Sequence, residues 1–240
     1  MPSPADEIIA AAASGDIERV TALLDTDPAL MNATNMFGST PVHAAHYSGH
    51  SGIVRLLFER GRARDGFLAA EIGLIDELRT ELDRDPSFVT RFSPIGATAL
   101  HGACYWGSQP AARLLLERGA DVNALTTDSF LKIAPIGSAV AAPDVPNPSH
   151  DESVVLALVG LLVDFGADVN RPRRDGMTAL HAAAYRGHVE VIRKLLSAGA
   201  NPNARSHADG GPHAGQSPLD TALSQGQSAA AETLRSAMAR

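Results

Sequence analysis

Pairs of leucines recur along the chain, and each pair lies in a helix-like stretch that ends a few residues later at a glycine. The pairs are Leu56 and Leu57 before Gly61, Leu115 and Leu116 before Gly119, Leu161 and Leu162 before Gly166, and Leu195 and Leu196 before Gly199. A glycine suits the end of a helix because it adopts the left-handed backbone conformation without a Cβ penalty. The pattern therefore predicts a series of amphipathic helices.

A second, alanine-rich pattern comes before these stretches. Residues 38–45 read GSTPVHAA, residues 96–103 GATALHGA, residues 176–183 GMTALHAA and residues 215–222 GQSPLDTA. The Thr or Ser hydroxyl can cap a helix N-terminus, and a proline in the next position needs no hydrogen bond for its nitrogen. The small alanines keep this helix thin, so neighbouring units can stack closely. We therefore expect a short inner helix before each leucine-rich outer helix.

The combined pattern resembles the ankyrin repeat, which runs G-x-T-P-L-H-x-A-A-x-x-G-H and then V-x-x-L-L-x-x-G-A-D-x-N. The resemblance implies an all-α solenoid of helix–turn–helix units with hairpin-like loops, stabilised by stacking between neighbours. We count about seven units in a single domain over residues 1–240. They are 4–34, 35–62, 63–92, 93–124, 125–170, 171–203 and 204–240. In the same way His43, His101 and His181 are expected to be buried and to tie hairpin to helix.

A longer repeat lies over the shorter one. His43 and His101, Gly15 and Gly73, and Pro28 and Pro86 are each 58 positions apart. Units one and two therefore mirror units three and four, and duplication of a two-unit module is the simplest account. The first unit of each module lacks the Thr-Pro-x-His start, so we expect a weaker unit with a longer loop after its outer helix.

The fifth and seventh units depart from the pattern. The fifth has Ala134 and Gly137 where the family has Thr and His, and an insert over 141–152 contains three prolines that forbid a continuous helix. The seventh has an extension over 207–215 ahead of its helix. Insertions map to loops, which on a rigid scaffold often carry function. Either insertion could equally be tolerated surface variation.

Ankyrin-family proteins usually bind on the concave face, formed by the hairpin tips and by exposed positions near the end of each inner helix. Those positions lie just before the glycines at 49, 107 and 187, and they hold every tyrosine and the single tryptophan of the chain. Tyr and Trp bury much area with few rotors, as residues at binding hot spots do. The predicted binding residues are Phe37 and Phe130 at hairpin tips and His46, Tyr47, Tyr105, Trp106, Tyr185 and Arg186 at helix ends. Local packing at the helix ends is the alternative.

Charge is unevenly distributed. The chain has a net charge of −7, which argues against general affinity for nucleic acid or an anionic membrane. Residues 171–205 nevertheless carry seven basic side chains against two acidic ones, and residues 121–170 carry one against seven. Arg171, Arg173 and Arg174 crowd one hairpin tip, where they could contact a carboxylate or phosphate. An ordinary solvated loop is the alternative.

No catalytic motif is found, and Cys104, the single cysteine, is expected to be a small buried apolar residue. His207, Asp209 and His213 give only a weak metal pattern, so we predict no metal or cofactor.

The leading hypothesis is a protein-binding or scaffold protein that acts as a monomer. The second is a small-molecule binder or atypical enzyme with the 141–152 loop closed over the aromatic groove, and the third is a passive structural role. The absence of a signal peptide or an apolar stretch of about 20 residues predicts a cytoplasmic protein, and the arginine- and alanine-rich composition a bacterial one.

Overall fold

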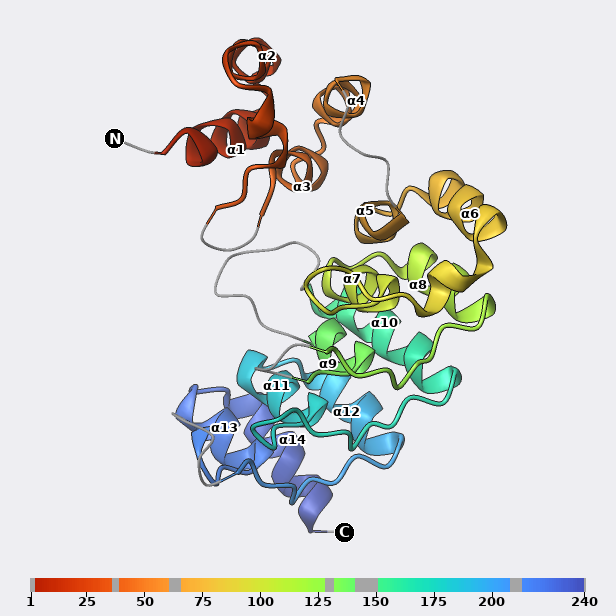
Figure 1. Ribbon diagram of the computed structural model, residues 1–240. Helices are drawn as coiled ribbons and strands as arrows, with labels where there is room; N and C mark the ends of the chain where they lie inside the picture. The colour runs from red at the N-terminus through yellow and green to blue at the C-terminus, as the bar shows by residue number, and fades with distance from the viewer. Residues whose placement is uncertain are drawn as a thin grey trace. The chain divides into compact units, whose positions relative to one another are not determined.

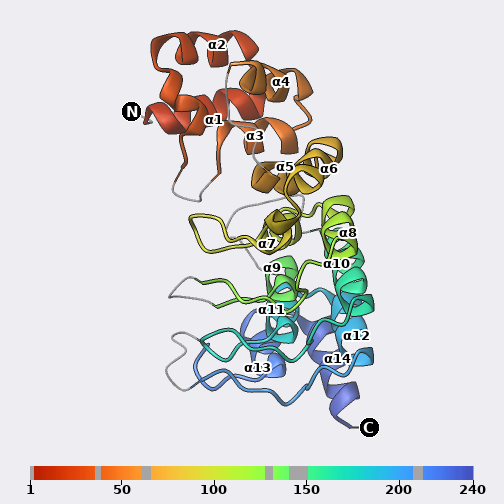
Figure 2. The same ribbon diagram turned by 45° about the vertical axis from the view of Figure 1, so that its right-hand side comes forward.

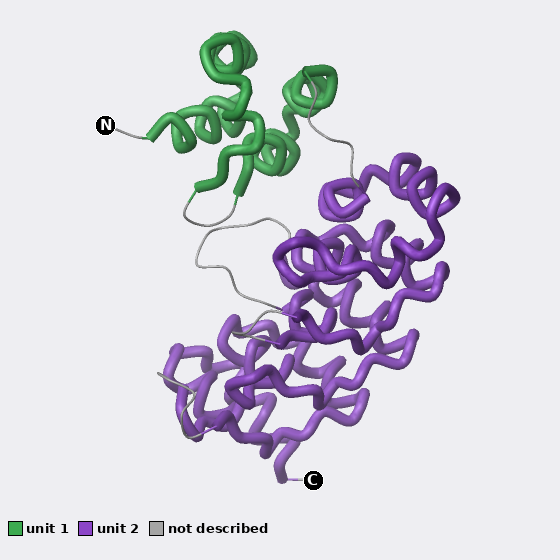
Figure 3. Tube along the Cα trace, viewed as in Figure 1, with its two compact units in different colours: residues 1–65, 143–148 green, residues 66–142, 149–240 purple. Residues whose placement is uncertain are grey.

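The computed structural model describes residues 3–35, 39–60, 66–127, 132–140, 151–207 and 213–239. It divides into two compact units, the first ending before Gly66 and the second holding the described residues from Gly66 onward (Figure 3). The single domain over 1–240 stays a prediction.

The described residues form fourteen α-helices in seven consecutive pairs. Each pair falls within one of the seven repeats predicted from the sequence, which are distinct from the two compact units. The all-α repeat architecture is therefore confirmed. Unit 1 holds α1 (Pro4–Ser14), α2 (Ile17–Thr26), η1 (Pro28–Asn32), α3 (Pro41–Tyr47) and α4 (Ser51–Glu59). Unit 2 holds α5 (Gly66–Ile72), α6 (Ile75–Arg84), η2 (Pro86–Thr90), α7 (Ala99–Tyr105), α8 (Gln109–Glu117), α9 (Pro135–Val140), α10 (Glu152–Asp164), α11 (Ala179–Arg186), α12 (Val189–Ser197), α13 (Pro218–Ser224) and α14 (Ser228–Met238).

Unit 2 consists of two layers of helices. The inner helices α5, α7, α9, α11 and α13 pack on one another in order, and the outer helices α6, α8, α10, α12 and α14 do the same (Figure 1; Figure 2). Ala103 and Ala183 are fully buried in the inner layer, and Leu158 and Leu195 in the outer one. Burying a leucine side chain contributes about 1.5–3 kcal/mol. Stacking of neighbouring repeats therefore supplies the core that no single pair could form.

The buried histidines connect successive repeats. The Nδ1 atom of His101 accepts a hydrogen bond from the backbone N–H of Thr98 at 3.2 Å, which leaves Nε2 to donate to the carbonyl of Ile133 at 3.0 Å. His181 repeats the arrangement, with Nε2 3.1 Å from the carbonyl of Gln216. The predicted tie between hairpin and helix is present. Each ring also reaches the next repeat, about 35 residues ahead, and so stabilises the stack.

Asparagines of the G-A-D-x-N motif connect the loops after the outer helices. Asn123 donates to the carbonyl of Gly166 at 3.2 Å and accepts from the backbone N–H of Asp168 at 2.8 Å. Asn170 makes the corresponding bonds one repeat later, to Gly199 at 2.9 Å and from Asn201 at 2.7 Å. This chain of amide bonds fixes the spacing of three successive repeats.

The structure confirms the 58-residue duplication. Helices α2, α3 and α4 and the 3₁₀ turn η1 begin and end 58 positions before α6, α7, α8 and η2. An ion pair joins Asp25 to Arg60 in unit 1, and its counterpart joins Asp83 to Arg118 at 2.8 Å in unit 2. The longer loops expected in the first repeat of each module are η1 and η2.

The fifth repeat keeps its two helices despite its altered start. Ala134 offers no capping hydroxyl to α9. Thr126 instead accepts the N–H of Ile133 on its hydroxyl oxygen at 3.0 Å. The predicted insert over 141–152 lies outside the described residues up to 150, and α10 begins immediately afterwards, capped by Asp151.

Candidate binding surface

Helix α7 ends in two adjacent aromatic side chains. Tyr105 is its last residue and Trp106 its C-cap, and their rings meet edge-to-face with centroids 5.3 Å apart. Both residues are partly buried. An aromatic residue that is neither in the core nor fully solvated presents a rigid apolar surface, which suits recognition.

Helix α11 ends at the corresponding place with Tyr185 and Arg186. The carbonyl of Tyr185 accepts a hydrogen bond from Nε2 of Gln227 at 3.4 Å. Gly187 follows in the left-handed conformation, with φ of 73°, and a Cβ there would lie 2.3 Å from Oε1 of Gln227. Glycine therefore suits this position, which ends the helix directly after Tyr185 and Arg186.

Arg186 is the least satisfied polar side chain of this surface. Its Nε and Nη2 atoms are buried, and no described residue accepts a hydrogen bond from either. Burial lowers the pKa of Arg186, while the phenol groups of Tyr185 and Tyr105 raise it by smaller amounts. Burial is therefore the main influence on the pKa of this guanidinium.

Of the other predicted binding residues, two belong to unit 1 and two are not among the described residues. His46 and Tyr47 end α3 in unit 1, with ring centroids 5.1 Å apart, and burial lowers the pKa of His46. Phe37 and Phe130 lie outside the described residues. Tyr105, Trp106, Tyr185 and Arg186 stand at the ends of two inner helices of unit 2, and we call them the α7–α11 surface.

The arginine-rich hairpin is partly neutralised by its own sequence. Arg173 donates through Nε to Oδ1 of Asp175 at 3.2 Å and through Nη2 to Oδ2. Arg171 and Arg174 are exposed. The anion contact predicted for Arg171, Arg173 and Arg174 stays a prediction, and the guanidinium of Arg173 already holds a carboxylate.

Sequence reasoning missed one hydrophobic hairpin tip. Ile95 lies in the turn closed by the bond from the N–H of Gly96 to the carbonyl of Ser93, and 77% of its surface is exposed. The 58-residue repeat was the available signal, because Ile95 occupies the same position in its repeat as Phe37, which is one of the predicted binding residues. Phe92, on the same hairpin, is 42% exposed.

Other reactive residues are engaged in the fold. Cys104 is buried in the core, where burial raises the pKa of its thiol. The ring of His213 lies 5.8 Å from that of Tyr185, and its Nδ1 is 3.2 Å from Oε1 of Gln216. Among the described residues, no group of three or more His, Cys, Asp or Glu side chains is arranged to hold a metal ion.

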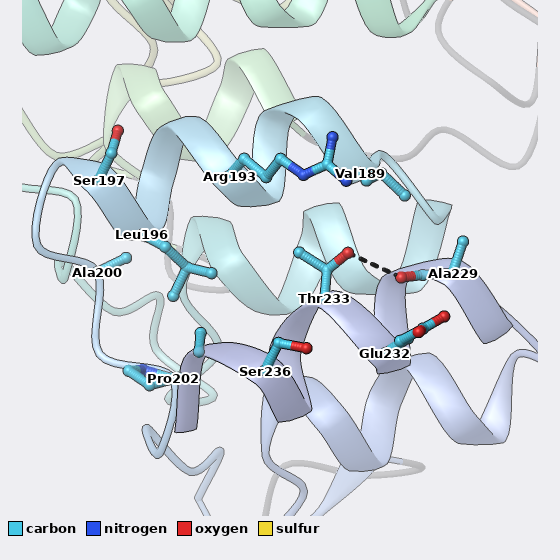
Figure 4. A pocket seen from close by; sticks show the side chains of 11 residues that line it. Val189, Arg193, Leu196, Ser197, Ala200, Pro202, Ala229, Glu232, Thr233 and Ser236 are labelled. Carbon is cyan, nitrogen blue, oxygen red and sulfur yellow. Dashed lines mark hydrogen bonds between the residues drawn. The ribbon is translucent and has the colours of Figure 1, made fainter. Parts of the chain in front are cut away.

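A groove of about 820 Å³ lies between the outer helices α12 and α14 (Figure 4). Val189, Arg193 and Leu196 line it from α12, and Glu232 and Thr233 from α14. No residue of the α7–α11 surface is among its lining. This groove therefore lends no support to a small-molecule site beside Trp106.

The part of the chain that the structure describes has no helix both long and apolar enough to cross a bilayer.

Comparison with known proteins agrees with the architecture. A family model described as "Ankyrin repeats (3 copies)" matches residues 8–126, and one described as "Ankyrin repeats (many copies)" matches 155–196 and 183–235. A probable E3 ubiquitin-protein ligase, XBOS32, of Oryza sativa subsp. japonica is 29% identical over 85% of this chain and 40% of its own length. The B-cell lymphoma 3 protein homolog of Mus musculus is 31% identical over 79% of this chain and 42% of its own.

A third relative has a higher sequence identity over a shorter stretch. The Notch-regulated ankyrin repeat-containing protein of Xenopus tropicalis is 52% identical over 18% of this chain and 37% of its own length. The chain spans about two fifths of the length of the curated relatives that it matches. These relatives come from a plant and two vertebrates, so they give no support to the bacterial origin expected from composition. On the family models and the stacked helix pairs together, the chain belongs to the ankyrin-repeat family.

Proposed function

We propose that this protein binds a partner protein, and that in unit 2 the contact is made by the α7–α11 surface together with the hairpin tip at Ile95. One observation carries the proposal. Every tyrosine and the single tryptophan of the chain stand at the C-terminal end of an inner helix. Repeat proteins use the continuous surface of their stacked units for binding, and Tyr and Trp dominate binding hot spots.

The two ends of this surface have different chemistry. Tyr105 and Trp106 offer apolar area, Ile95 offers an exposed aliphatic side chain, and Arg186 offers a positive charge. Such a combination favours a protein segment with both apolar and polar side chains. The small-molecule alternative would need an enclosed cavity beside Trp106, and the large groove lies instead on the outer helices.

We also propose a monomer in the cytoplasm that does not bind nucleic acid. The net charge of −7 opposes binding to polyanions. The single cysteine, Cys104, can form no disulfide within the chain, which suits a reducing compartment.

The test begins with a phage-displayed library of random 16-residue peptides, panned on the full chain. Selected peptides are synthesised with a fluorophore, and their affinity is measured by anisotropy. The double substitution Tyr105→Ala with Trp106→Ala should weaken binding by about 30-fold or more, equivalent to the roughly 2 kcal/mol expected of a hot spot.

Phe165→Ala is the matched control, because Phe165 is 39% exposed at the end of the outer helix α10. It should leave binding unchanged. Peptides that bind the Tyr105→Ala, Trp106→Ala variant as tightly as the unmodified chain would refute the proposed surface.

A further inference from the structure

Two donor nitrogens of the Arg186 guanidinium have no hydrogen-bond acceptor among the described residues. Nε and Nη2 are the two nitrogens that share one edge of the group, and both are buried without a described acceptor. A buried unsatisfied donor destabilises a fold by about 1–3 kcal/mol, and more when the group is charged. A side chain in this state is explained most simply by an acceptor that arrives with a ligand.

The same chain shows what fits that edge. In the neighbouring hairpin, Arg173 uses Nε and Nη2 to hold both oxygens of the Asp175 carboxylate. Paired parallel bonds of this kind are the strongest that arginine makes with a planar acceptor. The same two nitrogens of Arg186 therefore have the donor geometry for one carboxylate.

Acidic residues at the start of α10 do not fill this position. Glu152 accepts the backbone N–H of Glu190 at 2.7 Å, and Asp151 accepts the N–H of Ser153 at 2.9 Å, so both carboxylates cap helices. Both act on His188, whose pKa is lowered mainly by burial. Neither is hydrogen-bonded to Arg186.

The guanidinium lies in a partly buried setting. Burial lowers the pKa of Arg186, and the phenol groups of Tyr185 and Tyr105 raise it by smaller amounts. Burial also lowers the local dielectric constant, which strengthens a charge pair formed there. An acidic side chain with apolar neighbours matches this setting better than a highly charged, fully hydrated segment does.

We propose that Arg186 binds one aspartate or glutamate side chain of the partner protein through Nε and Nη2. The inference rests on the proposed function and specifies the partner's chemistry. It predicts a binding segment with one acidic residue at a fixed position, flanked by apolar residues.

The test uses the peptides selected above, which are displayed without a free C-terminus so that only side-chain carboxylates are available. Sequences selected on the unmodified chain should share one Asp or Glu. Arg186→Gln should weaken their binding by about 30-fold or more, and Arg186→Lys by a substantial part of that, because lysine keeps the charge but loses the paired geometry. Replacing the shared Glu by Gln in the peptide should weaken binding to the unmodified chain but hardly change binding to Arg186→Gln. Thermal unfolding checks that both variants fold.

The outcomes separate the two proposals. Two outcomes would overturn carboxylate binding by Arg186 and leave the proposed function standing. In the first, the selected peptides share no acidic residue. In the second, they bind Arg186→Gln unchanged while Tyr105→Ala with Trp106→Ala abolishes binding. Peptides insensitive to both sets of substitutions overturn the proposed surface and carboxylate binding by Arg186 together.

Discussion

Replacing Arg186 by methionine should stabilise the free protein. Methionine retains an unbranched stem but removes the buried donors Nε and Nη2. Each unsatisfied buried donor destabilises the fold by about 1–3 kcal/mol. Because the residue as a whole is only partly buried, we take the lower end for the pair and expect the free energy of unfolding to rise by about 1–2 kcal/mol. For a chain of this size that corresponds to roughly 2–8 °C in melting temperature.

Urea denaturation followed by circular dichroism measures this change. Arg113→Met is the control, since Arg113 is exposed on α8, and it should alter the free energy of unfolding by less than about 0.5 kcal/mol. A fall of about 1 kcal/mol or more in the free energy of unfolding of Arg186→Met would show that the guanidinium stabilises the free protein. It would refute the reasoning that Nε and Nη2 are hydrogen-bonded only in a complex. A residue that weakens the free protein while strengthening a complex is the expected compromise at a binding site.

Three further predictions concern the stack. Gly187→Ala should destabilise the protein more than Gly199→Ala, because both glycines have positive φ but only at Gly187 would a Cβ collide, with Gln227; equal melting temperatures for the two variants would count against the contact. Asn170→Ala should lower the free energy of unfolding by about 0.5–1.5 kcal/mol, because it removes two exposed hydrogen bonds, to the carbonyl of Gly199 and from the backbone N–H of Asn201; unchanged urea midpoints would contradict this. Burial lowers the pKa of His181, so the unfolded chain binds the extra proton first and stability should fall as the pH drops below about 6.5; urea midpoints that rise from pH 7.5 to pH 5.5 would show the opposite sign.

Much of the fold could be predicted from the sequence because its signals are local and repeated. Thr98 caps α7, and Gly187 ends α11, as their residue types indicated. The 58-residue spacing gave the correspondence of whole helices and, through it, of the Asp25–Arg60 and Asp83–Arg118 ion pairs. What it did not show was the reach of His101 to the next repeat, because that contact depends on how closely two units stack.

The place of the proposed binding surface could be predicted from the sequence, but its chemistry could not. Tyr105, Trp106 and Tyr185 were identified because the distance to the following glycine fixes their position on the inner helix. The unpaired edge of Arg186 depends on tertiary burial, which no spacing reveals. The pair Arg173–Asp175 is two residues apart and was within reach of sequence reasoning. Ile95 was within reach too, through its counterpart Phe37.

Trp106 provides the most direct test of the central claim, because it is the only tryptophan in the chain and lies within the α7–α11 surface. A selected peptide without tryptophan is titrated into the full protein while the emission spectrum is recorded, and an attached fluorophore reports binding independently by anisotropy. If the partner contacts this surface, Trp106 emission should shift with a saturation curve that matches the anisotropy. Saturated binding with an unchanged Trp106 spectrum would contradict the account.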